Sequence, residues 1–180
     1  MPKKEYRIMI LKRLNLNLCL VKSNRLLFLF IIIILGVILN FLLSFIYYDL
    51  LGINLGQEND SLLSIPKNMQ FILAIFIAPL IETAFFQYFP IVLTLRILLN
   101  LNIISSYSKK YFYVAVIISS LLFALIHTFS IVYFFVTFIM GLYFGYITII
   151  SEFVREKRIN VFISVGLVHA LLNLMAIIFD

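Results

Sequence analysis

The chain has 180 residues, of which 64% are hydrophobic and only 12% are charged. A soluble domain of this size needs a polar surface that this composition cannot supply, and apolar runs of 18 or more residues are typical of transmembrane helices. The net charge of +6 does not indicate a nucleic-acid partner. The cations gather at alternate ends of the apolar runs, which indicates orientation in a lipid bilayer and contact with anionic lipid.

Residues 1–25 are basic with interspersed Leu, Ile and Met, and we expect this segment to lie on the cytosolic face of the membrane. Residues 26–180 form a single multi-span membrane domain, because no repeat or linker divides them. The first span is predicted at about 26–48 and is followed by a polar, extracytoplasmic segment. The second is predicted at about 69–99, where Pro90 is expected to end or kink the helix and to leave the residues after it along the cytosolic interface.

Residues 112–150 form a nearly uncharged stretch that is long enough for two spans, with a tight turn predicted near 127–130. The last span is predicted at about 161–179. The sequence therefore predicts an all-α integral membrane protein of about five transmembrane helices, with a cytosolic N-terminus. On this topology every one of the fourteen Lys and Arg except Lys67 is cytosolic, which is the expected positive-inside pattern.

Three ionisable side chains interrupt the apolar spans: Glu82, His127 and His169. A glutamate at the middle of a membrane helix costs about 2.5–3.5 kcal/mol of insertion. Such residues are rare within spans and mark functional sites by default. We therefore expect the three side chains to meet in a polar cluster between helices.

The spacing of neighbouring residues supports this convergence, because residues four apart share one face of a helix. Asn173 follows His169 at this spacing, and His127 follows Phe123 at the same spacing. Thr83 and Gln87 form a third such pair beside Glu82. Three helices thus each present one polar face, and the candidate site is predicted to lie between these three helices.

A cluster of this composition contains the groups needed to hydrolyse an amide with activated water. A carboxylate in a dry site is a strong base, and a neighbouring imidazole can help to polarise water. A second imidazole and an amide can supply donors to a developing oxyanion. For any one of these side chains, an interhelical hydrogen bond that only holds helices together is an equal alternative.

Other intramembrane protease sites do not fit the sequence. The serine type needs a serine framed by glycines, so Ser119 and Ser120 are interpreted as packing residues. The two-aspartate type needs acids within spans, whereas Asp49 and Asp180 lie at span ends. The H-E-x-x-H zinc motif is absent.

Over about residues 70–177 the chain resembles the CPBP family, the CAAX-protease and bacteriocin-processing intramembrane peptidases, also called Abi. Members carry E-E-x-x-x-R on one helix, F-x-x-x-H on the next and H-x-x-x-N on a later one. This sequence reads E-T-A-F-F-Q at 82–87, F-A-L-I-H at 123–127 and H-A-L-L-N at 169–173. The resemblance implies a glutamate-dependent endopeptidase of a bacterial plasma membrane, whose partners are the lipid bilayer and a peptide or protein substrate within it.

The resemblance also implies roles for the motif residues. Glu82 and His127 would activate water, and His169 and Asn173 would form the oxyanion site. Thr83, Gln87 and Phe123 would support them. No cofactor is implied; the alternative is a zinc ion held by Glu82, His127 and His169.

Two positions depart from the family pattern, because Thr83 stands in place of the second Glu and Gln87 in place of the Arg. In the family these positions could form an ion pair on one helix face. Replacing both leaves a neutral pair and strands no charge in the membrane. We therefore expect a retained site with a neutral support, and the alternative is a catalytically inactive immunity or peptide-binding protein. An ion or proton pathway through the three ionisable residues is a third reading.

Depth within the membrane poses a further question. If the second span ends near Pro90, Glu82 and His169 lie about 10–12 Å from the cytosolic end of their helices, at 1.5 Å per residue. Measured in the same way from Tyr111, His127 lies about 24 Å deep. The sequence does not reconcile these depths.

Overall fold

The computed structural model describes residues 24–52, 66–101, 109–127, 130–154 and 160–179, and every regular element in this part of the chain is helical. The elements, with π-helical segments written η, are α3 (Arg25–Ser44), η1 (Phe45–Leu50), α5 (Lys67–Ile72), η2 (Leu73–Ile77), α6 (Ala78–Glu82), η3 (Thr83–Tyr88), α7 (Phe89–Asn100), α8 (Lys109–Leu125), α9 (Ile131–Ile149), η4 (Ile150–Val154) and α10 (Val161–Phe179). The N-terminal segment 1–23 and parts of the predicted loops lie outside the described residues.

Polar side chains begin several of these helices. Asn24 accepts a hydrogen bond from the backbone nitrogen of Leu27 (2.7 Å), and Ser130 accepts one from that of Tyr133 (3.1 Å). Asn160 does the same for Phe162 at the start of α10. Each oxygen satisfies an N–H group that has no partner within its helix. The helix starts are thus set by short-range sequence signals.

Within the described residues, four continuous helical stretches are long and apolar enough to cross a membrane: Arg25–Asp49, Lys67–Leu98, Ile131–Val154 and Val161–Ile178. A shorter apolar helix, Lys110–Leu125, lies between the second and third of these. Helices satisfy their own backbone groups, which is why they can span a bilayer. The prediction of an all-α membrane protein with about five helices is therefore confirmed.

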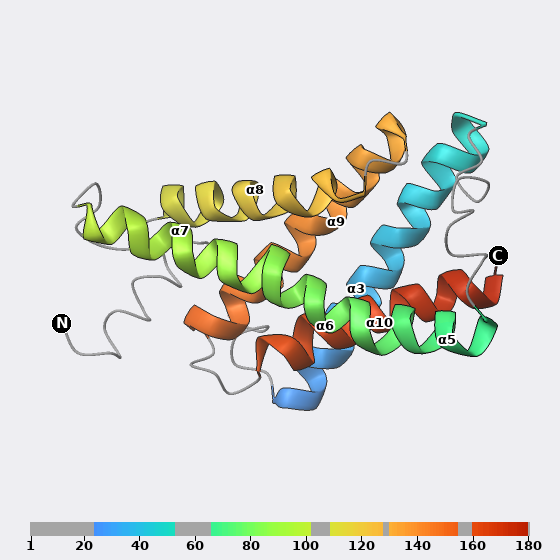
Figure 1. The fold of residues 1–180 in the computed structure, drawn as a ribbon, viewed down its shortest axis with the longest axis horizontal. Helices are drawn as coiled ribbons and strands as arrows, with labels where there is room; N and C mark the ends of the chain where they lie inside the picture. The colour runs from blue at the N-terminus through green and yellow to red at the C-terminus, as the bar shows by residue number, and fades with distance from the viewer. Residues whose placement is uncertain (1–23, 53–65, 102–108, 128–129, 155–159, 180) are drawn as a thin grey trace.

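The helices alternate in direction. In Figure 1 the ends of α7 and α9 and the starts of α8 and α10 lie on the left, whereas the starts of α5 and α9 and the end of α10 lie on the right. The chain reverses direction between the end of α8 at Leu125 and the start of α9 at Ile131, close to the turn that the sequence predicts. This alternation is what successive membrane crossings require.

The pair α8 and α9 packs closely because α9 presents two glycines to it. A Cβ added at Gly141 would lie 3.0 Å from the backbone Cα of Ser120, and one added at Gly145 would lie 2.9 Å from Val116 Cγ1. Small residues spaced by four let helix backbones approach in a membrane. The G-x-x-x-G pair at 141–145 therefore positions α8, which carries Phe123 toward its C-terminal end.

The second long helix passes through two π-helical segments, η2 and η3, that flank α6. It continues beyond Pro90 to Asn100, so of the two outcomes predicted at Pro90, an end or a kink of the helix, the end is wrong. Proline can be accommodated in a membrane helix when local π adjustments and neighbouring side chains satisfy the freed backbone groups. Here η3 ends two residues before Pro90.

This continuity reconciles the depths of Glu82 and His127. Glu82 lies as many residues before the end of α7 at Asn100 as His127 lies after the start of α8 at Lys109. At 1.5 Å per residue both distances are about 27 Å. Figure 1 also shows α7 and α8 extending further to the left than the start of α10, so His169 reaches the same level from a shorter stretch of helix. The mismatch thus came from ending the second helix at Pro90.

Candidate functional site

Glu82 is the last residue of α6, and its carboxylate lies between two imidazole rings. Its Oε2 is 3.5 Å from Nε2 of His169 and 3.8 Å from Nε2 of His127. The Glu82 side chain is 18% exposed, and Oε2 is buried without a hydrogen bond among the described residues. The structure therefore brings together the three ionisable side chains that the sequence singled out. We refer to them below as the Glu82 cluster.

His127 follows the end of α8, and a backbone hydrogen bond fixes its ring. Nδ1 lies 2.8 Å from the carbonyl oxygen of Phe123. A carbonyl only accepts, so Nδ1 carries the proton and, in the neutral ring, Nε2 faces Glu82 with a lone pair. His127 Nε2 can therefore accept a proton or a hydrogen bond on the side of the carboxylate.

Aromatic rings hold His169 in place. Its ring stacks on Phe144 of α9, with centroids 5.0 Å apart and an interplanar angle of 27°. Phe123 packs edge-on against the same ring at 5.8 Å, and it lies tilted against the His127 ring at 4.6 Å. Phe123 is 3% exposed and touches both imidazoles. This placement fits the supporting role expected of it.

Thr83 and Gln87 are completely buried beside the cluster, at 0% and 1% exposure. The Gln87 amide oxygen lies 2.9 Å from the hydroxyl of Ser119 on α8, and this hydroxyl also lies 2.6 Å from the carbonyl of Phe86. Thr83 Oγ1 and Gln87 Nε2 are buried without a hydrogen-bond partner among the described residues. The two positions thus form a neutral, polar, water-excluded layer.

One proton on the Ser119 hydroxyl cannot serve two oxygens fully. If the Gln87 amide is turned over, its Nε2 donates to Ser119 Oγ and the hydroxyl proton goes to Phe86. This orientation gives the buried amide nitrogen a partner. Gln87 is then held by α8 as well as by its own helix.

Asn173 lies one turn beyond His169 on α10, but its side chain is engaged elsewhere. Its Nδ2 donates to the carbonyl oxygen of Ala74 in η2, at 2.8 Å. No hydrogen bond in the described part of the chain joins Asn173 to the Glu82 cluster. Asn173 on α10 thus contacts the helix that carries Glu82 at Ala74 in η2, the segment directly before α6.

Sequence reasoning missed the partners of these buried polar groups. The sequence favours packing for Ser119, although it lies four residues before Phe123 and therefore shares a face of α8 with it. A further signal was Pro90, whose missing N–H leaves helix carbonyls in need of a donor. Phe144 carried no such signal, because it is one of many aromatic residues in α9.

The zinc alternative involves the same three side chains. Among the described residues, no group of three or more His, Cys, Asp or Glu is arranged to hold a metal ion. The Glu82 cluster itself has the separations of ion pairs, 3.5 and 3.8 Å.

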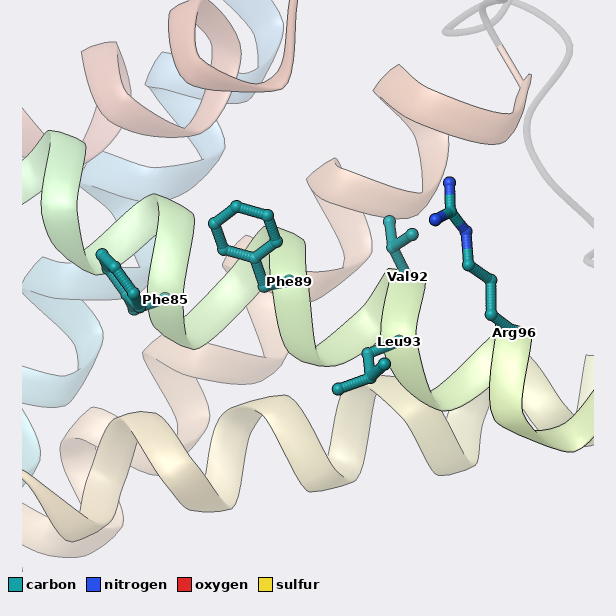
Figure 2. A pocket seen from close by; sticks show the side chains of 5 residues that line it. All are labelled: Phe85, Phe89, Val92, Leu93 and Arg96. Carbon is teal, nitrogen blue, oxygen red and sulfur yellow. The ribbon is translucent and has the colours of Figure 1, made fainter.

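A separate hollow of about 340 Å³ lies on the outer side of η3 and α7. Phe85, Phe89, Val92, Leu93 and Arg96 line it, and Figure 2 shows these side chains along one helix with Arg96 at one end. The hollow is almost entirely apolar and contains none of the three cluster residues. It is therefore not the place where the Glu82 cluster could act.

A family model described as type II CAAX prenyl endopeptidase Rce1-like matches residues 65–175. The matched range covers more than half of the chain and contains Glu82, His127, His169 and Asn173. No curated protein and no solved structure matches the chain.

Proposed function

Since the chain belongs to the type II CAAX prenyl endopeptidase Rce1-like family, a family of proteases within membranes, we propose that it is an intramembrane endopeptidase using water activated by Glu82 and His127. The observation that supports this proposal is the position of Glu82 Oε2, within 3.8 Å of Nε2 of both histidines. The substrate is a peptide or protein reached within the bilayer.

In the proposed reaction, the Glu82 carboxylate and His127 Nε2 both accept hydrogen bonds from one water molecule. Glu82 takes a proton as the water oxygen attacks the carbonyl carbon of the substrate. His169, with a proton on Nε2, donates to the developing oxyanion. When the C–N bond breaks, Glu82 returns the proton to the leaving nitrogen.

The surroundings of the cluster favour this chemistry. The His169 side chain is 9% exposed and those of Glu82 and His127 are 18% and 17% exposed. In such a water-poor site, electrostatic interactions with a developing charge are much stronger than in bulk water. The aromatic contacts of His127 and His169 keep the two rings from turning away.

The decisive experiment is cleavage in proteoliposomes with a prenylated C-terminal peptide and a bacteriocin leader peptide as candidate substrates. Glu82→Gln and His127→Ala should each lower kcat by at least about 10²-fold, the usual contribution of a general acid or base. Glu152→Gln, an acid in η4 outside the cluster, is the matched control and should cleave normally. If Glu82→Gln cleaves at the wild-type rate, the proposal is wrong.

The same preparation separates the proposed mechanism from the zinc alternative. If side chains alone activate the water, the rate of cleavage should be unchanged by a strong chelator, and added zinc should not increase it. Loss of cleavage with a chelator, restored by zinc, would instead assign Glu82, His127 and His169 as metal ligands.

A binding protein without activity is the second candidate, and the neutral pair favours it. Thr83 and Gln87 replace the two charged positions of the family motif, and Thr83 Oγ1 is buried without a hydrogen-bond partner among the described residues. Such a protein could act in bacteriocin immunity by holding a peptide. Peptide binding that survives both Glu82→Gln and His127→Ala, without any cleavage by the wild type, would support it.

A further inference from the structure

Pro79 disturbs the hydrogen bonding of the helix just before Glu82. The Ala78 N–H bonds five residues back to the carbonyl of Leu73. In α6 the donors again reach four residues back, as the Thr83 N–H does to the Pro79 carbonyl, and the same pattern pairs the N–H of Ile81 with the carbonyl of Ile77. Pro79 has no N–H, and Leu80 is the only donor left for three carbonyls, those of residues 74–76. One N–H cannot serve three carbonyls fully, so this turn is open to a donor from another helix.

Asn173 supplies one of these partners. Its Nδ2 donates to the carbonyl oxygen of Ala74 at 2.8 Å, across 99 positions of sequence. The acceptor has no hydrogen to give, so the nitrogen of the amide must face Ala74. Asn173 therefore connects α10 to the second long helix at a carbonyl that Pro79 left free.

Pro90 creates the same situation on the other side of Glu82. The Phe89 N–H bonds five residues back to Ala84, while α7 follows the four-residue pattern. Ile91 is then the only donor left for the three carbonyls of residues 85–87. The hydroxyl of Ser119 lies 2.6 Å from one of them, that of Phe86. Ser119 of α8 thus donates to a free carbonyl after Glu82, as Asn173 of α10 does to the Ala74 carbonyl before it.

We infer that Asn173 and Ser119 are positioning residues that hold Glu82 toward the two histidines. Each side chain binds a backbone carbonyl left free by a proline, and the two carbonyls lie on opposite sides of Glu82 in the chain. Asn173 is on the helix of His169, and Ser119 is on the face of α8 that leads to His127. Each connection therefore fixes Glu82 relative to one histidine, either His169 on α10 or His127 directly after α8. The inference rests on the proposed function for its effect on cleavage.

The inference assigns Asn173 differently from an oxyanion donor. A donor touches the substrate, and removing it costs about 10²–10³-fold in kcat whatever residue stands at position 79. A positioning residue that donates a hydrogen bond to the Ala74 carbonyl becomes dispensable once a backbone N–H of the same helix can donate to that carbonyl. Pro79→Ala restores an N–H at the position that can do so.

The test is a double-mutant cycle with Pro79→Ala, Asn173→Ala and the double variant, measured by thermal unfolding in bicelles and by cleavage in proteoliposomes. Asn173→Ala should lower the unfolding midpoint by about 2–4 °C and kcat by about 10–100-fold with KM unchanged. In the Pro79→Ala background both losses should shrink by more than half. Equal losses in both backgrounds would overturn the inference for Asn173.

The second arm compares Ser119→Ala with Ser120→Ala. Both serines are fully buried, but Ser120 donates only to Val116 within its own helix, a bond whose loss is nearly neutral. Ser119→Ala should lower the midpoint by about 2–4 °C and reduce kcat, whereas Ser120→Ala should change neither. Equal behaviour of the two variants would overturn the inference for Ser119. If Pro79→Ala does not fold, the comparison of the two serine variants still tests the inference.

The unfolding measurements separate failure of the inference from failure of the proposed function. Absence of cleavage by the wild type would count against the protease. Coupling between positions 79 and 173 in the unfolding midpoint would still support the hydrogen-bond connection. Cleavage without that coupling would retain the protease and reject the connection.

Discussion

At the scale of single residues, the protein buries polar groups beside the Glu82 cluster and keeps them neutral. Thr83 and Gln87 are inaccessible to solvent, so an unpaired charge at either position would be costly. Ser119 contacts the Gln87 amide, and a longer side chain at position 87 would displace the Ser119 hydroxyl. The neutral pair is thus matched to its neighbours on α8.

A prediction follows for the two positions that depart from the family motif. Thr83→Glu alone should lower the free energy of unfolding by about 2–3 kcal/mol, because it places a single charge in the membrane. Thr83→Glu with Gln87→Arg should recover more than half of this loss, since the new side chains are four residues apart and can pair.

Equilibrium unfolding and folded yield after purification measure this difference, with Thr83→Ala as the control for loss of the hydroxyl. If the single and double charged variants are equally unstable, Thr83 and Gln87 are not a neutral substitute for an ion pair.

At the scale of elements, the distance between α8 and α9 depends on glycine. A Cβ at Gly145 would lie 2.9 Å from Val116 Cγ1, which is closer than real contacts allow. A Cβ at Gly166 on α10 would only reach ordinary contact, 3.9 Å from Leu80 and Thr83. The two glycines are therefore not equivalent, although both lie in apolar helices.

Gly145→Ala should destabilise the protein by about 1–3 kcal/mol through overpacking, whereas Gly166→Ala should be nearly neutral. Combining Gly145→Ala with Val116→Ala should recover part of the loss, because the clashing methyl groups are gone. Thermal unfolding of the four proteins checks this. A Gly166→Ala variant as unstable as Gly145→Ala would contradict the packing argument.

At the scale of the whole molecule, the alternation of helix ends gives a topology that labelling can test. The chain is a multi-pass membrane protein, and the positive-inside pattern predicts that Leu101 lies at the cytosolic side and Leu51 outside. Both residues are well exposed at helix ends, at 64% and 58%.

In a Cys19→Ser background, Leu51→Cys should react with a membrane-impermeant maleimide in intact bacterial cells. Leu101→Cys should react only after the cells are opened. The reverse pattern would invert the predicted orientation and place the N-terminus outside.

Local pattern determined a large part of this protein. Apolar run length and the positions of cations predicted the helices, because insertion into a bilayer depends on the residues of each span. Helical periodicity predicted which side chains share a face with His127 and with His169. The free-energy cost of placing ionisable side chains within a membrane predicted that the two histidines meet Glu82. Whether these residues catalyse a reaction stays a prediction.

Only the tertiary structure decided how the backbone around Glu82 is completed. Pro90 reads as a helix end because the sequence shows the missing N–H and not the donor that compensates for it. That donor lies 33 positions away in Ser119, and the one for Ala74 lies 99 positions away in Asn173. A free carbonyl can be satisfied by any donor that packing brings within reach. For this physical reason the motif residues could be named from the sequence, whereas the partners of Asn173 and Ser119 could not.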